Sequence, residues 1–148
     1  MRGICAFAIF FLIVSCSSLP RTGELNYSLS SIKKIVQDIV PGKIIRRSVN
    51  GRVMTSESFN LPRNFRTQKV AMTKSGKWTE LGRVTLTILG SERPYYVELG
   101  VESMLWNGTS YQPNGQLEEY TKYLIDRIQN ELAKRHDNRD LINDFRAF

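Results

Sequence analysis

Histidine and cysteine, the residue types most used for metal binding and nucleophilic catalysis, are almost absent from this chain. Its 148 residues include one histidine, His136, and two cysteines, Cys5 and Cys16. A zinc site needs several histidine or cysteine ligands, and an activated serine or cysteine needs a base beside it. The chain also has no phosphate-binding glycine loop, no Gly-x-Ser-x-Gly elbow and no Ser-x-x-Lys element. We therefore expect a protein that is not an enzyme, with no catalytic residues, no metal and no cofactor.

Long apolar runs are also missing, since crossing a bilayer takes about 20 apolar residues. The most apolar segment extends from Ile4 to Val14 and ends at the polar residues 15–18. Arg2 precedes this segment and the small Ser15 follows it, as in an export signal. A retained membrane helix is the alternative, and the shortness of the segment argues against it.

The end of this segment, Ile13-Val14-Ser15-Cys16, resembles the lipobox of bacterial lipoproteins. The resemblance implies that residues 1–15 are a signal peptide and that Cys16 carries acyl chains that anchor the protein in a membrane. In such lipoproteins Asp after the lipidated cysteine commonly marks inner-membrane retention, and here Ser17 follows instead. The resemblance thus implies a cell outer membrane location with the domain facing the periplasm. Signal cleavage without lipidation is the alternative.

The charge of the chain is strongly basic. Lys and Arg number 21 against 14 Asp and Glu, so the net charge is +7. Outside the cytoplasm the counter-charges are lipid phosphates, lipopolysaccharide, wall polymers and acidic protein faces, and we expect no nucleic-acid partner. The alternative is a scatter of solvated charges that keeps the domain soluble.

The N-terminal part of the mature chain predicts a tether and then a helix. Residues 16–27 lack periodicity and contain Ser, Pro and Gly, which favours a lipidated tether. From Leu29 to Val40 apolar residues recur every three or four positions, which predicts an amphipathic helix. Ser28 or Ser30 can cap this helix, and Pro41-Gly42 ends it. We expect its apolar stripe to pack in the core.

The middle of the chain predicts strands. Asn50-Gly51 is a strong hairpin signal between residues 44–49 and 52–59, and a two-residue loop pairs Ser48 with Val53. The resulting hairpin has no cleanly apolar face, so it is expected at an edge or projecting from the sheet. Residues 65–73 read as a third strand ending in a turn at 74–77.

Two runs follow in which apolar and polar residues alternate, one from Arg83 to Ile88 and one from Tyr95 to Glu102, and the last helix comes after them. The apolar residues of both runs share one face of the sheet if Ile88 lies opposite Tyr95 and Leu86 opposite Val97. Residues 107–115 read as a long turn. An apolar stripe then predicts a C-terminal helix, formed by Leu117, Tyr120, Leu124, Ile125, Ile128 and Leu132. Residues 28–136 would form the domain and 137–148 a charged tail or short helix.

These elements predict an α+β fold, an antiparallel sheet of about five strands with N- and C-terminal helices packed on one face. This two-layer sandwich resembles in outline the small domains of envelope-assembly lipoproteins. Among them are the helix-grip domains of the outer-membrane protein insertion machinery and the lipopolysaccharide-assembly lipoprotein. The likeness is one of fold outline and carries no site residues.

A non-enzymatic lipoprotein that binds or braces another cell-envelope component is the function we expect. The alternatives are a lipid or lipopolysaccharide binder and, third, an enzyme acting on wall polymer. Basic residues of the hairpin near aromatic residues of the sheet would form the partner surface. The candidate residues are Arg46, Arg47, Arg52, Arg83, Tyr96 and Trp106.

Overall fold

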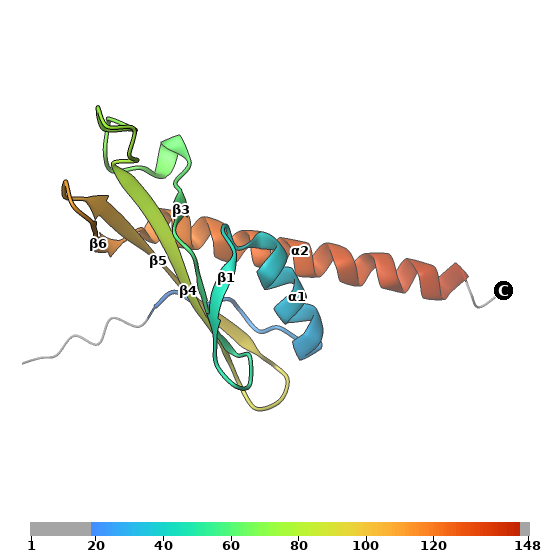
Figure 1. The fold of residues 1–148 in the computed structure, drawn as a ribbon. Coiled ribbons are helices and arrows are strands. Elements are labelled where there is room, and N and C mark those ends of the chain that lie inside the picture. Colours follow the sequence, from blue (N-terminus) through green and yellow to red (C-terminus); the bar gives the residue numbers. More distant parts are fainter. Residues whose placement is uncertain (1–18, 146–148) are drawn as a thin grey trace, which may run out of the picture.

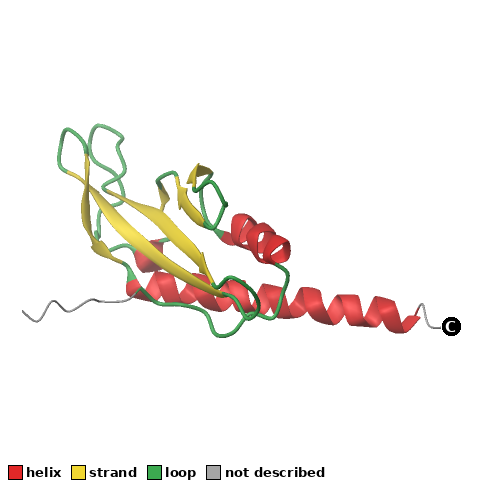
Figure 2. Ribbon diagram, turned by 90° about the horizontal axis from the view of Figure 1, so that it is seen from below, coloured by secondary structure: helices red, strands yellow, loops and turns green. Residues whose placement is uncertain are grey.

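Two helices cover one face of an antiparallel six-stranded sheet in the computed structural model of this chain (Figures 1 and 2). The structure describes residues 19–145, and side chains within residues 19–135. The predicted signal peptide, Cys16 and the side chain of His136 lie outside the described residues. Apolar residues of both helices and of the inner sheet face form one buried cluster, so the predicted two-layer α+β sandwich is confirmed.

The first helix, α1, extends from Leu29 to Ile39 as its apolar spacing predicts. The Ser28 hydroxyl caps it by accepting a hydrogen bond of 3.2 Å from the Ser31 backbone N–H. Ile32, Ile35, Val36 and Ile39 are buried. The predicted start of this helix and its place in the core are confirmed.

The sheet has the strand order β1-β2-β4-β5-β6, and the short β3 also pairs with β4. All pairings are antiparallel. The strands are β1 (Ile44–Arg47), β2 (Val53–Ser56), β3 (Phe59–Asn60), β4 (Glu80–Leu89), β5 (Tyr96–Trp106) and β6 (Tyr111–Gln116).

The β1–β2 hairpin forms at Asn50-Gly51 with the predicted pairing. The Ser48 backbone N–H donates to the Val53 carbonyl at 2.9 Å, and Arg47 lies opposite Met54. Gly51 has φ +63°, a conformation that glycine adopts without steric cost. Within residues 19–145, β1 pairs with β2 alone, which makes it an edge strand.

The predicted register of β4 against β5 is wrong by two residues. Leu86 lies opposite Leu99, not Val97, and Ile88 lies opposite Val97. A shift of two leaves every side chain on its expected face, so alternation alone cannot distinguish the two registers. The pairing of β4 with β5 ends at Leu89 opposite Tyr96, and Tyr95 pairs with Leu25 on the other edge of β5.

Two further predictions of secondary structure are wrong. Residues 65–73 form no third strand: Arg63–Phe65 is a short 3-10 helix, η1, and an irregular loop follows it. Residues 112–115 are not a turn into the last helix but belong to β6, where Pro113 and Gly115 are accommodated on an edge strand beside a bulge.

The predicted tether is wrong for residues 20–25, which lie along β5 as part of the sheet. The Thr22 N–H donates to the Val97 carbonyl at 2.9 Å, and the Leu99 N–H donates to the Pro20 carbonyl at 3.0 Å. This segment covers one half of the β5 edge and β6 covers the other. Where the N-terminal segment and β6 meet, the Leu117 N–H donates to the Val101 carbonyl, and the Val101 N–H donates to the Thr121 hydroxyl. The folded domain therefore begins near residue 19.

The second helix, α2, is continuous from Glu118 to Phe145. Its backbone therefore includes residues 137–145, where a tail or a separate short helix was expected. Its 28 residues span about 42 Å, and its C-terminal part extends beyond the sheet (Figure 1). Arg135 pairs with Asp38 of α1 at 3.1 Å, which joins the two helices. The predicted apolar stripe from Tyr120 to Leu132 is buried.

Candidate functional site

The structure does not bring the six candidate partner residues into one surface. Tyr96 begins β5 and Trp106 ends it, so they lie about 33 Å apart at 3.3 Å per residue. Arg46 and Arg47 lie on β1 at the far edge of the sheet. The expectation that these residues form one surface is therefore wrong, because the length of β5 separates Tyr96 from Trp106.

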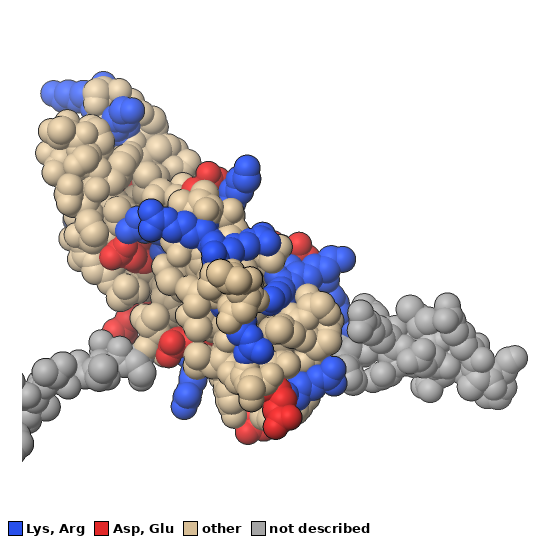
Figure 3. Space-filling view, turned by 60° about the horizontal axis from the view of Figure 1, so that its bottom comes forward, with Lys and Arg blue, Asp and Glu red and all other residues tan. Residues whose placement is uncertain are grey.

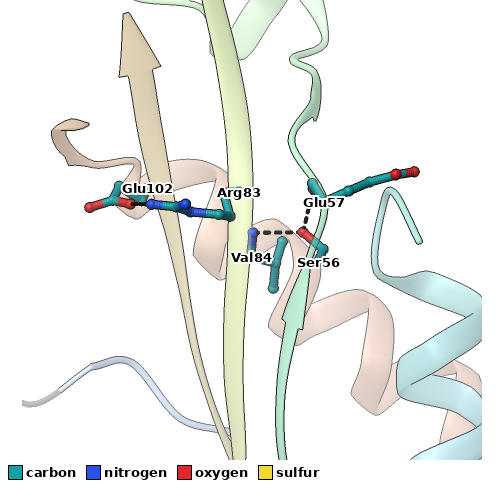
Figure 4. Close-up of polar contacts among 5 residues, drawn as sticks. All are labelled: Ser56, Glu57, Arg83, Val84 and Glu102. Atoms are coloured by element: carbon teal, nitrogen blue, oxygen red, sulfur yellow. Dashed lines mark hydrogen bonds and ion pairs between the residues drawn. The ribbon is translucent and has the colours of Figure 1, made fainter. Parts of the chain in front are cut away.

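Arg83 and Arg52 are engaged in contacts within the domain. Arg83 Nη2 lies 2.7 Å from Glu102 Oε2 on the uncovered sheet face (Figure 4). Arg52 donates to the carbonyls of Gly90 and Ser91, which ties the β1–β2 hairpin to the β4–β5 loop. Both side chains therefore have a role in the fold itself.

Ser56, buried between β2 and β4, continues the sheet where the ladder between these strands ends. Its hydroxyl accepts from the Val84 N–H at 3.0 Å and donates to the Glu57 carbonyl at 2.8 Å (Figure 4). This bridge fixes the base of the hairpin against the central strand.

The two candidate aromatic residues are also covered in part. The Tyr96 hydroxyl lies 3.3 Å from Glu24 Oε1, and the Arg21 guanidinium lies 5.7 Å from the Tyr96 ring centroid. Trp106 packs on Tyr111 with the ring centroids 5.1 Å apart. No open aromatic patch results.

A different group of residues on the β1–β2 hairpin is exposed, and we call it the hairpin surface: Ile45, Arg46, Arg47, Val49 and Val53. Val49 is fully exposed, and Ile45 and Val53 are 56% and 41% exposed. Among the described residues, Arg46 and Arg47 form no ion pair. The surface combines apolar side chains, uncompensated positive charge and a free strand edge.

The hairpin surface is held in place from two sides. Lys33 of α1 donates to the Asn50 carbonyl at the hairpin turn at 2.8 Å, and Arg52 holds the β4–β5 loop. Figure 3 turns this end of the molecule toward the viewer, and Lys and Arg side chains cross the middle of the face. The exposed residues of the hairpin surface therefore lie on a hairpin that α1 and the β4–β5 loop hold in place, among other basic side chains.

At the other end of the sheet lies a cavity of about 610 Å³ that we call the cationic pocket. Its lining residues are Arg63, Arg66, Thr67, Gln68, Lys69 and Ala71. Three of these carry positive charge and none is acidic. Arg66 is oriented by a hydrogen bond of 2.8 Å from its Nε to the Leu61 carbonyl, and its guanidinium lies 4.9 Å from the Trp78 ring centroid.

The loop that forms this pocket is shaped by the buried carboxylate of Glu80, which is 1% exposed. Glu80 Oε2 accepts from the backbone N–H groups of Thr67 and Gln68 at 2.7 and 3.0 Å. Its Oε1 accepts from the hydroxyls of Ser103 at 2.6 Å and Thr67 at 3.0 Å. Because the N–H groups of Thr67 and Gln68 donate to the Glu80 carboxylate, they are not available for pairing with another strand. This explains why residues 65–73 do not form the predicted strand.

An aromatic cluster secures the other side of the loop. Phe65 packs on Tyr120 of α2 with centroids 4.6 Å apart, and Tyr123 stacks on Tyr120 at 5.8 Å. Burial, then the charge of Tyr123, raises the pKa of Tyr120, and Arg127 opposes the shift. The pocket wall is therefore attached both to the sheet and to α2.

The residues of the cationic pocket are not among the candidates predicted from the sequence. Arg63, Arg66 and Lys69 recur at intervals of three just after Pro62, and this spacing was a usable signal. On the strand predicted at residues 65–73, Arg66 and Lys69 would point to opposite faces, and Arg63 precedes that strand, so the prediction separated the three side chains.

The fold and these two surfaces define a small two-layer α+β domain with an exposed basic hairpin at one end and a cationic pocket at the other. Comparison with known proteins gives no relative, since no family model, no curated protein and no solved structure matches the chain. Within the part of the chain that the structure describes, neither helix has the length and apolarity needed to span a bilayer. The same part contains no group of three side chains suited to hold a metal ion.

Proposed function

We propose that this protein is a lipoprotein of the cell outer membrane that binds or braces another protein of the cell envelope, without catalysis. The observation that carries the proposal is the hairpin surface. Three exposed apolar side chains are costly to leave in water, and the two arginines beside them form no ion pair among the described residues. Such a combination is typical of a surface that a partner covers.

The short distance between Cys16 and the folded domain supports a position at the membrane. Sheet pairing begins at Pro20, so only three residues separate Cys16 from it, a reach of about 10–15 Å. Two or more acyl chains would hold the domain stably at the bilayer. A domain confined in this way meets a membrane partner at high effective concentration, so a weak interface suffices.

The exposed groups also define the chemistry of the partner. The free edge of β1 offers backbone hydrogen bonds to an extended segment, as in strand addition. Arg46 and Arg47 favour acidic side chains on that segment, and Ile45, Val49 and Val53 favour apolar ones. The partner is therefore an envelope protein that presents an extended acidic and apolar segment.

Photocrosslinking from two positions in source cells tests this proposal. A photoreactive amino acid replaces Val49 in the full lipidated chain, and the same residue at Val70 is the matched control. Val70 is 64% exposed at the opposite end of the sheet. We expect one envelope protein to be crosslinked from position 49, not from position 70, and to a much smaller extent when Cys16→Ser removes the anchor. Equal products from both positions would contradict a specific hairpin partner.

A lipid or lipopolysaccharide binder is the second candidate function. The observation that favours it is the cationic pocket, because three positive side chains around one cavity suit a phosphate. The segment that lines the pocket, residues 63–71, and the turn of the β1–β2 hairpin lie at opposite ends of the sheet (Figure 1), so the two functions do not exclude each other.

A further inference from the structure

We propose that the cationic pocket binds a phosphorylated sugar, either free or as the headgroup of a glycolipid. This site is separate from the hairpin surface, and the proposal rests on the second candidate function above, which it deepens by naming the ligand. The charge of the lining, the rigidity of the loop and the size of the cavity support it.

The charge of the lining selects an anion. Arg63 and Lys69 are exposed, and among the described residues neither forms an ion pair. Arg66 uses Nε for the Leu61 carbonyl, which leaves its two terminal NH₂ groups for a ligand. The planar fork of arginine matches phosphate oxygens in two parallel hydrogen bonds, and lysine adds a compact positive charge.

The negatively charged Glu80 lies beneath the loop, and Glu118 and Glu119 line a neighbouring cavity that shares Arg66 and Thr67 with the pocket. The Glu80 oxygens already accept four hydrogen bonds from Thr67, Gln68 and Ser103. The carboxylate is therefore bonded to the back of the loop and is itself buried. It reduces the attraction for an anion without occupying the cationic side chains.

The rigidity of the loop lowers the cost of binding. The backbone at Thr67 and Gln68 is fixed by Glu80, and Phe65 is packed on Tyr120. Arg66 is held over the Trp78 ring. Groups that are ordered before a ligand arrives lose little freedom when it binds.

The size and polarity of the cavity favour a sugar phosphate over a phosphate ion alone. A volume of about 610 Å³ is far more than one phosphate ion needs. The Gln68 side-chain amide lines the cavity and, among the described residues, has no protein hydrogen bond. It is available for sugar hydroxyls.

Calorimetric titration of the full lipidated protein in detergent tests this site, with glucose 1-phosphate as the first probe. Glucose and inorganic phosphate are the comparison ligands, because each lacks one half of the probe. We expect glucose 1-phosphate to bind at least tenfold more tightly than either, with an affinity that falls as salt rises. Equal affinity for inorganic phosphate and glucose 1-phosphate would overturn the sugar part of the proposal.

Charge-removing variants locate the site. Arg63→Gln and Lys69→Gln change exposed side chains, so the fold should be retained, and each should weaken binding about tenfold. Lys74→Gln is the matched control, because Lys74 is exposed in the same loop region and does not line the pocket. Arg66→Gln should weaken binding most. An equal effect of Lys74→Gln and Arg63→Gln would show nonspecific attraction to a basic protein and overturn the proposal.

A second probe separates the two sources of the ligand. Lipid A, a phosphorylated sugar headgroup with acyl chains, is titrated in micelles of the same detergent. Tighter binding of lipid A than of glucose 1-phosphate, weakened in Arg63→Gln, identifies a glycolipid ligand. The reverse order identifies a free sugar phosphate, and binding of neither probe overturns the proposal. The crosslink from position 49 reports on the hairpin surface alone, so failure of one site is distinguishable from failure of the other.

Discussion

The two ends of the sheet are built in different ways, although both present positive charge. The hairpin end is formed by local turn chemistry at Asn50-Gly51 and leaves apolar side chains in water. The pocket end is formed around the buried Glu80, whose partners lie more than ten positions away along the chain. A surface carried by a local turn can change with little loss of stability, whereas a loop bonded to a buried carboxylate cannot.

Glu80→Ala gives the largest expected effect and tests the pocket end. The change removes four hydrogen bonds and leaves two loop N–H groups without a partner. We expect the free energy of unfolding to fall by about 3 kcal/mol in urea denaturation. Glu92→Ala, in the exposed β4–β5 loop, is the control and should change it little. A loss below about 1 kcal/mol for Glu80→Ala would mean that the loop does not depend on this carboxylate.

Thr22→Val tests whether the N-terminal segment belongs to the sheet. The Thr22 hydroxyl accepts from the buried Val97 N–H at 2.9 Å, and valine keeps the shape without the acceptor. We expect a loss of about 1.5 kcal/mol in thermal or urea unfolding. If residues 16–27 were a tether, the same substitution would have no measurable effect. Asn26→Ala, at an exposed neighbouring position, provides the comparison.

Gly51→Ala tests the local origin of the hairpin. The residue has φ +63°, where an added Cβ costs about 1 kcal/mol. Gly51→Asn is the matched variant, because asparagine tolerates this conformation better, and its loss should be smaller. Equal losses for the two variants in urea unfolding would contradict the turn argument.

Tyr120→Phe gives the smallest expected effect and appears only at high pH. Because the pKa of Tyr120 is raised in the folded state, the unfolded chain ionises first as the pH rises past about 10. The folded protein therefore loses stability as the pH rises above about 10, and the stability that depends on a neutral Tyr120 side chain is fully present below that pH. We expect the difference in the free energy of unfolding between wild type and Tyr120→Phe to be constant up to about pH 9 and then to shift against wild type. A difference that stays constant up to pH 11 would contradict the raised pKa.

The elements that could be predicted from the sequence are those that depend on neighbours along the chain. The Ser28 cap of α1 and the Asn50-Gly51 turn each need only a few adjacent residues, and both were confirmed. The register of β4 and β5 was wrong by two because alternation repeats every two residues. Tyr95 pairs with Leu25 on the other edge of β5, a pairing with a distant segment that the sequence did not indicate.

The candidate site was predictable only in part for the same reason. The exposed position of Arg46 and Arg47 on an edge hairpin follows from the turn and the mixed face. The pairing of Arg83 with Glu102 needs the correct register. The cationic pocket needs the loop shape that Glu80 imposes, and the regular spacing of its three cations does not specify that shape.

The most direct test of the account is the yield of the crosslink from position 49 when a single hairpin charge is reversed. Arg46→Glu is compared with Lys74→Glu, which changes the net charge equally at the opposite end of the sheet. The account predicts a several-fold lower yield of the envelope-protein crosslink for Arg46→Glu and an unchanged yield for Lys74→Glu. Equal yields from the two variants would contradict the claim that the hairpin surface binds the partner.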